Sequence, residues 1–202
     1  MVLIGAIGCG RLGFDEAGRP NEDASDGAPD DSGLDGTSIC TTSDRCDGFD
    51  NDCDAAIDED GCPVGCTGAA RGAAGYVFCA NPISSDAARA SCAAAGGALA
   101  RIDDAAENTW LRTTADAMGF ATFLWIGGRD DLVEGEWRWP DGAQFWQGDG
   151  TGGPTGLFVN WTASEPDDSG NREDCALLWT DGNWRDYACS DLNLFVCELP
   201  PP

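Results

Sequence analysis

The chain of 202 residues contains no histidine, and its 11 basic residues are all arginines, set against 36 acidic residues. The formal net charge is −25. Nucleic-acid binding is therefore not expected, since neutralising phosphates requires clustered positive charge. Without histidine, a triad with a histidine base and a histidine-ligated zinc site are both excluded. Hard cations remain possible, because Ca²⁺ prefers several oxygen ligands and carboxylates are abundant here.

Cysteine, by contrast, is abundant, with 11 residues of which ten lie beyond residue 39. We interpret them as a disulfide framework formed in an oxidising compartment. Zinc sites built from four cysteines are the alternative, but only the pair Cys62 and Cys66 resembles the spacing of such sites. The odd cysteine is Cys9.

Cys9 ends a short apolar run, and Ala6-Ile7-Gly8-Cys9 resembles a bacterial lipobox. Residues 1–9 would then be the remnant of a lipoprotein signal peptide, with Cys9 as the lipidated residue. A basic start and a longer apolar core, which a signal peptide needs, are missing, so its start is expected to be truncated. The alternative is a fortuitous apolar terminus. No other segment approaches the ~20 apolar residues of a membrane span, so membrane attachment is expected only through Cys9.

Residues 10–39 are rich in Asp, Glu, Gly, Ala, Pro and Ser and nearly lack large apolar side chains. Such a segment cannot bury enough surface to offset chain entropy. It predicts a disordered, self-repelling acidic linker that would hold the following part of the chain away from a membrane.

Residues 40–62 form a short segment with eight acidic residues and one arginine. Its acids Asp50, Asp52 and Asp54 alternate, and Asp58 follows at loop spacing. Alternate oxygens on a tight loop can face one cation, although the glycine and glutamate expected of an EF-hand at positions 6 and 12 are absent. The segment resembles the CDGxDNDCDxxxDE metal-binding motif of bacterial surface proteins and thrombospondin type 3 repeats, which implies a calcium site.

The alternative for this segment is a solvated acidic loop stapled by two disulfides. Its four cysteines allow three pairings, and the sequence does not decide between them. Cys40–Cys53 together with Cys46–Cys62 is a guess.

Residues 66–202 carry the core, since all eight Trp and six of the eight Phe lie there. One helix is predicted from Ser84 or Ser85 to about Ala95, before Gly96-Gly97. A second is predicted from Asp103 or Asp104 to Met118, with Glu107 completing a capping box. Strands are predicted over residues 123–126, 137–139, 176–179, 183–186 and 195–197. The long stretch 141–171 lacks a regular pattern, which is typical of a functional loop.

Several motifs in this region agree in order and spacing with one known family. They are Ala-Arg-Ala-Ser-Cys92, Gly96-Gly97-Ala98-Leu99, Trp125-Ile126-Gly127-Gly128, Glu165-Pro166-Asp167, Asp174-Cys175, Trp184-Arg185-Asp186, Cys189 and Cys197. Residues 66–199 thereby resemble a C-type lectin domain. The resemblance implies an α+β fold with two helices, small antiparallel sheets and a long irregular calcium loop.

The resemblance also implies the disulfides Cys66–Cys79, Cys92–Cys197 and Cys175–Cys189. The bridge from Cys92 would join the two ends of the domain, where the chain-entropy model gives a stabilisation of ~4–5 kcal/mol.

In sugar-binding members of the family, five residues hold the principal calcium ion, and they correspond to five positions of this chain. They are Glu165, Asp167, Glu173, Arg185 and Asp186. Members hold the intervening proline in the cis form, so that both flanking side chains point the same way. Arg185 departs from the family's asparagine and has no oxygen to donate. It either neutralises Asp167 and Glu173 by an ion pair, replacing the metal, or turns to solvent while water completes the calcium shell.

The auxiliary calcium site of the family maps onto five acids: Asp130, Glu134, Asp168, Glu173 and Asp174. Five carboxylates without a cation would repel one another, whereas a divalent ion would order the loop. The alternative is an acidic loop solvated by salt.

The resemblance implies a calcium-dependent carbohydrate-binding module, extracellular or displayed on a bacterial cell surface, in which sugar hydroxyls complete the calcium shell and hydrogen-bond to Glu165, Asp167, Glu173 and Asp186. Trp146, Phe158 and Trp161 either stack on a sugar or belong to the core, which is the interpretation favoured for Trp161. The alternative function, favoured by Arg185, is binding of a surface protein with purely structural calcium. An enzyme is not expected, because no pair of acids is marked out as acid and nucleophile.

Overall fold

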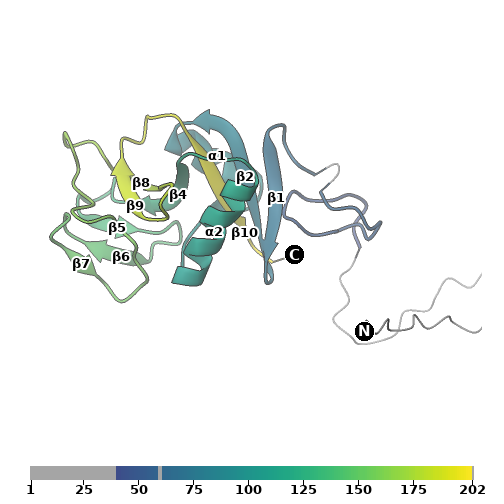
Figure 1. Ribbon diagram of the computed structural model, residues 1–202, viewed down its shortest axis with the longest axis horizontal. Coiled ribbons are helices and arrows are strands. Elements are labelled where there is room, and N and C mark those ends of the chain that lie inside the picture. Colours follow the sequence, from purple (N-terminus) through teal and green to yellow (C-terminus); the bar gives the residue numbers. More distant parts are fainter. Residues whose placement is uncertain (1–39, 59–60, 202) are drawn as a thin grey trace, which may run out of the picture. The chain divides into compact units, whose positions relative to one another are not determined.

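The structure is a computed structural model that describes residues 40–58 and 61–201 (Figure 1). The predicted signal remnant, Cys9 and the linker over 10–39 lie outside these residues. The described chain forms ten strands and two helices. In order they are β1 (Cys66–Arg71), β2 (Ala74–Ile83), α1 (Ser85–Ala94), β3 (Ala98–Leu99), α2 (Ala105–Ala117), β4 (Leu124–Arg129), β5 (Glu136–Arg138), β6 (Gln144–Gln147), β7 (Gly153–Pro154), β8 (Cys175–Leu178), β9 (Trp184–Tyr187) and β10 (Asn193–Leu199).

Both predicted helices are confirmed, together with the residues that begin them. The Ser84 hydroxyl accepts a hydrogen bond from the Ala87 amide at the start of α1. At the start of α2, the Asp104 carboxylate accepts from the Glu107 amide at 2.7 Å. Glu107 in turn accepts from the Asp103 amide at 2.7 Å, which completes the capping arrangement one residue earlier than a standard capping box.

The sheet runs in the order β1-β2-β10-β4-β5-β6-β7, with β8 on β4, β9 on β8 and β3 on β10. The α+β class is confirmed. Each of the five predicted strands is present with its ends shifted by a few residues, whereas β1, β2, β3, β6 and β7 were not predicted. The alanines and glycines of β1 have weak strand propensity, and pairing with β2 in a hairpin makes this segment extended. The stretch 141–171 also contains β6 and β7.

The core consists of two buried clusters that alternate along the central strands. In β2, Tyr76 and Phe78 pack in the cluster that includes residues of α2, while Val77 and Cys79 pack in the cluster that includes residues of α1. This alternation follows from the two-residue period of a strand. The sheet is therefore covered by apolar contacts on both faces.

Five disulfides hold the described chain together: Cys40–Cys53, Cys46–Cys62, Cys66–Cys79, Cys92–Cys197 and Cys175–Cys189. The last three are the pairs that the resemblance implied, and the first two are the pairing guessed for residues 40–62.

Residues 40–58 pack directly on the hairpin of β1 and β2. A Cβ atom on Gly68 would lie 2.2 Å from the Asp58 carboxylate, and one on Gly75 would lie 2.6 Å from the Asp47 Cβ. Cys46 is buried in the same apolar cluster as residues of α1. The acidic segment is thus seated on the sheet rather than held apart from it.

Candidate functional site

Three acids from distant parts of the sequence converge beside strand β9. Glu165 and Asp167 flank Pro166 in the long loop, and Asp186 lies in β9. One carboxylate oxygen from each of the three lies within 4.8 Å of the other two. The Glu165–Pro166 peptide bond is cis.

Asp186 is buried, Glu165 is partly buried and Asp167 is exposed, and two oxygens of the group are buried without a hydrogen-bond partner. Asp186 is 2% exposed, and its Oδ2 accepts from the Asp168 amide at 2.7 Å. Asp186 Oδ1 and Glu165 Oε2 are buried with no hydrogen-bond partner. Burial and the neighbouring Asp186 carboxylate raise the pKa of Glu165 to about 8.

Glu173 lies near this group but is not one of the three acids that meet within 4.8 Å. Its Oε2 accepts from the Ser169 amide at 3.0 Å. Burial, followed by repulsion from Asp186 and Asp167, raises the pKa of Glu173. Of the residues predicted for the principal site, the structure therefore brings Glu165, Asp167 and Asp186 together most closely.

A second acidic group lines a small cavity of about 20 Å³. Its acids include Asp130, Glu134, Asp168 and Asp186. Asp130 is 4% exposed, and its Oδ2 accepts from the Gly135 amide at 2.9 Å while Oδ1 has no partner. Burial and the charges of Glu134, Asp174 and Asp186 raise the pKa of Asp130 to about 7. The cavity has room for about one water-sized occupant.

The remaining residues predicted for the auxiliary site lie at its margin. The pKa of Asp174 is raised by burial and then by Asp168, so Asp174 lies within electrostatic reach of the cavity. Glu173 lies instead near the first group, where its Oε2 accepts the hydrogen bond from the Ser169 amide. These five carboxylates form a looser set than Glu165, Asp167 and Asp186.

Both groups have the chemistry of a hard-cation site. Buried acceptors without donors are costly, and these groups contain three of them: Glu165 Oε2, Asp186 Oδ1 and Asp130 Oδ1. A divalent cation would satisfy these oxygens, and Ca²⁺ takes six to eight oxygen ligands. The residues present therefore fit calcium.

Arg185 does not fill the principal site. Its guanidinium carbon lies 4.0 Å from the ring centroid of Trp179, and its Nη2 lies 3.9 Å from Asp181 Oδ2. Within residues 40–58 and 61–201, no ion pair joins Arg185 to Asp167 or Glu173. The predicted alternative in which Arg185 replaces the metal by such an ion pair is therefore wrong, because Trp179 offers a closer contact.

Most of the aromatic residues that were proposed to stack on a sugar pack in the core instead. Trp161 packs against Trp137 with ring centroids 4.8 Å apart, and against Trp184 at 5.8 Å. Phe158 meets the ring of Trp184 edge-on at 5.6 Å. Trp146 is 9% exposed. The interpretation of Trp161 as a core residue holds.

In the segment 40–62, the structure selects a different set of acids from the one predicted. Asp44, Asp50 and Asp52 each contribute one carboxylate oxygen to a group whose members lie within 4.8 Å of one another. Asp44 is 7% exposed, and it accepts from the amides of Asn51 at 2.7 Å and Asp58 at 2.7 Å. Asp50 Oδ1 is buried with no partner. Sequence reasoning missed Asp44 because it precedes the alternating run, although an acid just before Cys46 was visible.

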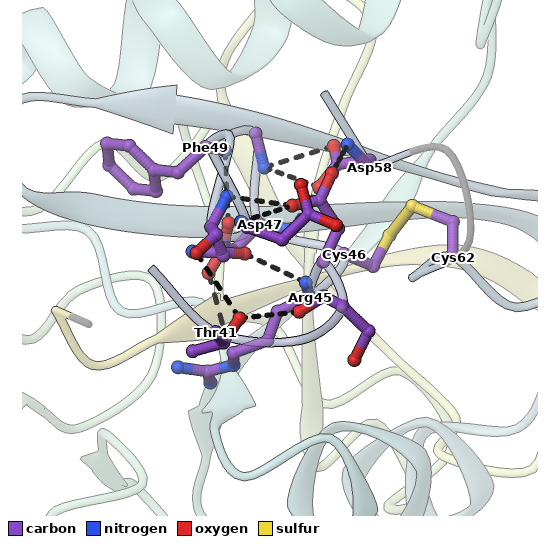
Figure 2. A network of polar contacts seen from close by, with 12 residues as sticks. Thr41, Arg45, Cys46, Asp47, Phe49, Asp58 and Cys62 are labelled. Atoms are coloured by element: carbon purple, nitrogen blue, oxygen red, sulfur yellow. Dashed lines mark hydrogen bonds and ion pairs between the residues drawn. A yellow bond between two sulfur atoms is a disulfide. The ribbon is translucent and has the colours of Figure 1, made fainter. Parts of the chain in front are cut away.

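The predicted ligands Asp54 and Asp58 are used elsewhere. Asp58 Oδ1 accepts from the amides of Asp47 at 2.9 Å and Gly48 at 3.1 Å, so it holds the turn that follows Cys46 (Figure 2). Asp54 is exposed and accepts from the Ala56 amide at 2.8 Å. Asp58 is thus a structural residue of the segment rather than a member of its closest acid group.

A family model of the Lectin C-type domain matches residues 81–199. The chain belongs to the C-type lectin family. The lectin domain is 33% identical over 127 residues to a hepatic lectin of Gallus gallus, covering 63% of this chain and 55% of that protein. It is 33% identical over 108 residues to pulmonary surfactant-associated protein D of Bos taurus, covering 54% of this chain and 26% of that protein. The chain therefore spans about half or less of the length of these relatives.

Solved structures are similar to the lectin domain over nearly their whole length. The mouse scavenger receptor C-type lectin carbohydrate-recognition domain matches with a TM-score of 0.56 and 27% identity, over 70% of this chain and 98% of that one. The cow carbohydrate-recognition domain of CD23, solved in the presence of GlcNAc2Man3 oligosaccharide, matches with a TM-score of 0.56 and 28% identity, over 70% and 97%. The lectin domain is therefore similar in fold to domains that are named for carbohydrate recognition.

Proposed function

We propose that this protein is a calcium-dependent carbohydrate-binding module that acts outside the cell. The observation that carries the proposal is the convergence of Glu165, Asp167 and Asp186, with two buried oxygens that lack a partner. The relatives named as lectins and carbohydrate-recognition domains support it, since C-type lectin domains generally bind calcium.

Each residue of the site would have a defined role in binding the cation and the sugar. Glu165, Asp167 and Asp186 would hold the cation, with Glu173 as a further ligand within reach. A bound Ca²⁺ supplies open coordination positions for two neighbouring hydroxyls of a sugar. The carboxylates would at the same time accept hydrogen bonds from those hydroxyls, which fixes the orientation of the ring.

The second acidic group would hold a calcium ion that orders the loop. Asp130, Glu134, Asp168 and Asp174 belong to the β4–β5 connection and to the segment that precedes β8. A cation between them would tie these two segments together, and Asp168 would connect the two sites through its amide hydrogen bond to Asp186. The group Asp44, Asp50 and Asp52 is proposed as a third calcium site on the acidic segment.

Display on a bacterial cell surface remains part of the proposal. A lipid on Cys9 would anchor the chain, and the acidic linker over 10–39 would hold the lectin domain away from the membrane. In residues 40–58 and 61–201, no helix has the length and apolar character needed to cross a bilayer.

The second candidate function is a C-type-lectin-like module that binds a surface protein without binding sugar. Arg185 favours it, because it occupies the sequence position at which the family's asparagine supplies an oxygen ligand, and a guanidinium has no oxygen to donate. The fold also accommodates other uses: a calcium-independent type II antifreeze protein matches with a TM-score of 0.54 and 26% identity. In both candidates the protein binds its ligand and does not catalyse a reaction.

A glycan array probed with the full chain in millimolar Ca²⁺, and again in EDTA, separates the two candidates. The carbohydrate proposal expects binding that EDTA abolishes. Asp186→Asn should weaken calcium binding by about 10-fold or more, as it removes one charge from the buried group. The matched control Asp191→Asn removes an exposed charge outside the group and should change nothing. Silence of the folded protein in both conditions would instead favour the protein-binding module.

A further inference from the structure

An apolar pocket of about 400 Å³ lies at the C-terminal end of strand β10. Its walls come from β2, β3, β10 and the β5–β6 connection, and from the two prolines that follow β10. The apolar residues that line it include Ala98, Leu99, Pro140, Leu199, Pro200 and Pro201. The acids proposed to bind calcium are not among its lining residues. A volume of this size is typical of sites that bind small organic molecules.

Three charged residues also line the pocket: Arg101, Asp141 and Glu198. The Arg101 guanidinium is already held by two carboxylates, since its Nε lies 2.5 Å from Asp103 Oδ1 and its Nη1 contacts Asp141 Oδ2. One positive charge thus meets two negative charges before Glu198 is counted. In the part of the chain that the structure describes, Glu198 forms no ion pair of its own.

The Glu198 carboxylate is partly buried and has one oxygen open to a ligand. Its Oε2 accepts a hydrogen bond from the Arg101 amide at 3.2 Å. Its Oε1 has no hydrogen-bond partner among residues 40–58 and 61–201, and it does not belong to the buried atoms that lack a partner, so it is accessible to solvent. Because Glu198 lines the pocket, a molecule seated there meets this carboxylate.

The surroundings of Glu198 are electrostatically negative. Burial, followed by the charges of Glu107 and Asp103, raises the pKa of Glu198, and the opposite effect of the Arg101 charge is smaller than that of either acid. Glu107 is 4% exposed and accepts a hydrogen bond from the Tyr76 hydroxyl, which supplies no positive charge. A partly buried carboxylate in such surroundings is stabilised when a cation lies beside it.

The single open oxygen of Glu198 indicates the kind of cation. A guanidinium binds a carboxylate best through two parallel N–H groups, whereas an ammonium group acts as a compact point charge. One open oxygen therefore suits an ammonium group better than a guanidinium. The apolar walls of the pocket suit an uncharged body that carries this group, because burying apolar surface is favourable.

We propose that this pocket binds a small organic molecule in which a primary ammonium group is joined to an apolar body. The ammonium group would donate a hydrogen bond to Glu198 Oε1, and the apolar body would pack against Leu99, Leu199 and the prolines. Arg101 would remain paired with Asp103 and Asp141. The pocket is separate from the acidic groups beside β9, so the proposal does not rest on calcium or carbohydrate binding.

The proposal is tested by titrating the full chain, labelled with ¹⁵N, with 2-phenylethylammonium chloride. Millimolar Ca²⁺ is present throughout, so that the probe competes with calcium at the acidic groups. Sodium chloride at matched ionic strength is the control for screening. The resonance of the Arg101 amide, which donates to Glu198, should shift saturably with the probe. A shift that is absent, or that is equal in sodium chloride, overturns the proposal.

Two analogues of the probe separate its charge from its apolar body. The compound 2-phenylethanol keeps the ring without the charge, and ethylammonium keeps the charge with little apolar surface. Each should bind about tenfold more weakly than 2-phenylethylammonium, or weaker still. Equal binding of the alcohol would mean that no ammonium group is recognised. Equal binding of ethylammonium would mean that only the net charge of −25 attracts the cation, and either result overturns the proposal.

Glu198→Gln should weaken binding of 2-phenylethylammonium about tenfold or more, because the hydrogen bond to the ammonium group loses its charged acceptor. The glutamine retains an oxygen that can accept from the Arg101 amide. Glu136→Gln is the matched control, since it removes the same charge from an acid that pairs with Arg138 outside the pocket. Equal affinities of the two variants, measured by calorimetry, would overturn the assignment of Glu198.

A second pair of variants tests the apolar walls without changing any charge. Ala98→Leu places a larger side chain at a lining position and should weaken binding of the same probe. Ala87→Leu makes the same change at an exposed position of α1 outside the pocket and should leave binding unaltered. Thermal unfolding without the probe confirms that each variant is folded. Equal affinities of Ala98→Leu and Ala87→Leu would exclude this pocket as the binding site.

Discussion

Arg185 lies over the ring of Trp179, with 4.0 Å between its guanidinium carbon and the ring centroid, while its neighbour Asp186 belongs to the buried acid group. Arg185 and Asp186 are consecutive residues of β9, and the guanidinium contacts Trp179 rather than the acids. The cation–π contact keeps the positive charge beside the site rather than inside it.

Arg185→Asn should therefore strengthen calcium binding by about tenfold, since an amide oxygen would replace a group that has none. Calorimetric titration with Ca²⁺ measures the effect. Arg172→Asn is the matched control, because it removes the same charge near Glu173 without placing an oxygen at the family's ligand position. Equal gains in the two variants would mean that only charge, and not a new ligand, is involved.

The stability of the metal-free protein should fall as the pH rises from 5 to 8. Burial raises the pKa of Glu165 to about 8 and that of Asp130 to about 7, so the folded chain holds protons that the unfolded chain releases. The stabilisation by these protonated acids is complete below pH ~4 and is lost as the pH passes 7 to 8. Thermal unfolding in EDTA at several pH values measures this slope.

Calcium should remove most of that pH dependence, because the cation takes the place of the protons. Binding of Ca²⁺ at pH 7 should release protons, which calorimetry in two buffers of different ionisation enthalpy detects. A Tm in EDTA that rises steadily from pH 5 to 8 would contradict the assignment of these buried acids.

Asp58→Ala should destabilise the acidic segment more than Asp54→Ala. Asp58 accepts hydrogen bonds from the amides of Asp47 and Gly48, whereas Asp54 is exposed and accepts only from its near neighbour Ala56. Losing a carboxylate that satisfies buried amides costs ~1–3 kcal/mol, or a few degrees in Tm for a chain of this size. Calorimetric unfolding of both variants compares them, and indistinguishable Tm values would rule out a structural role for Asp58.

Gly68→Ala should loosen the seating of residues 40–62 on the β1–β2 hairpin. The new Cβ would lie 2.2 Å from the Asp58 carboxylate and 2.7 Å from the Gly48 amide nitrogen, so the segment must move. Limited proteolysis should then cut within residues 40–62 sooner. Gly153→Ala is the matched control, because a Cβ there meets nothing within 4 Å. Identical cleavage rates in the two variants would show that the segment is not seated through this contact.

Local features were predictable from the sequence alone. The start of α2 depends on Asp104 and Glu107, which are three residues apart, and its end lies beside Gly119, which has a φ of +83°. Such features depend on hydrogen bonds within one helical turn, so the sequence contains all the partners. The order of motifs likewise indicated the C-type lectin family and most of the acids of the two acidic groups near β9.

Only the tertiary structure decided which charged side chains meet. Asp186 of β9 meets Glu165 of the long loop although strand β8 lies between them in the sequence, and Asp44 displaces Asp54 and Asp58 from the acid group of the short segment. Contacts of this kind depend on how whole segments pack and on which competing partner lies nearer, as Trp179 does for Arg185. No local pattern of residues contains that information, because the competing partners come together only when the chain folds.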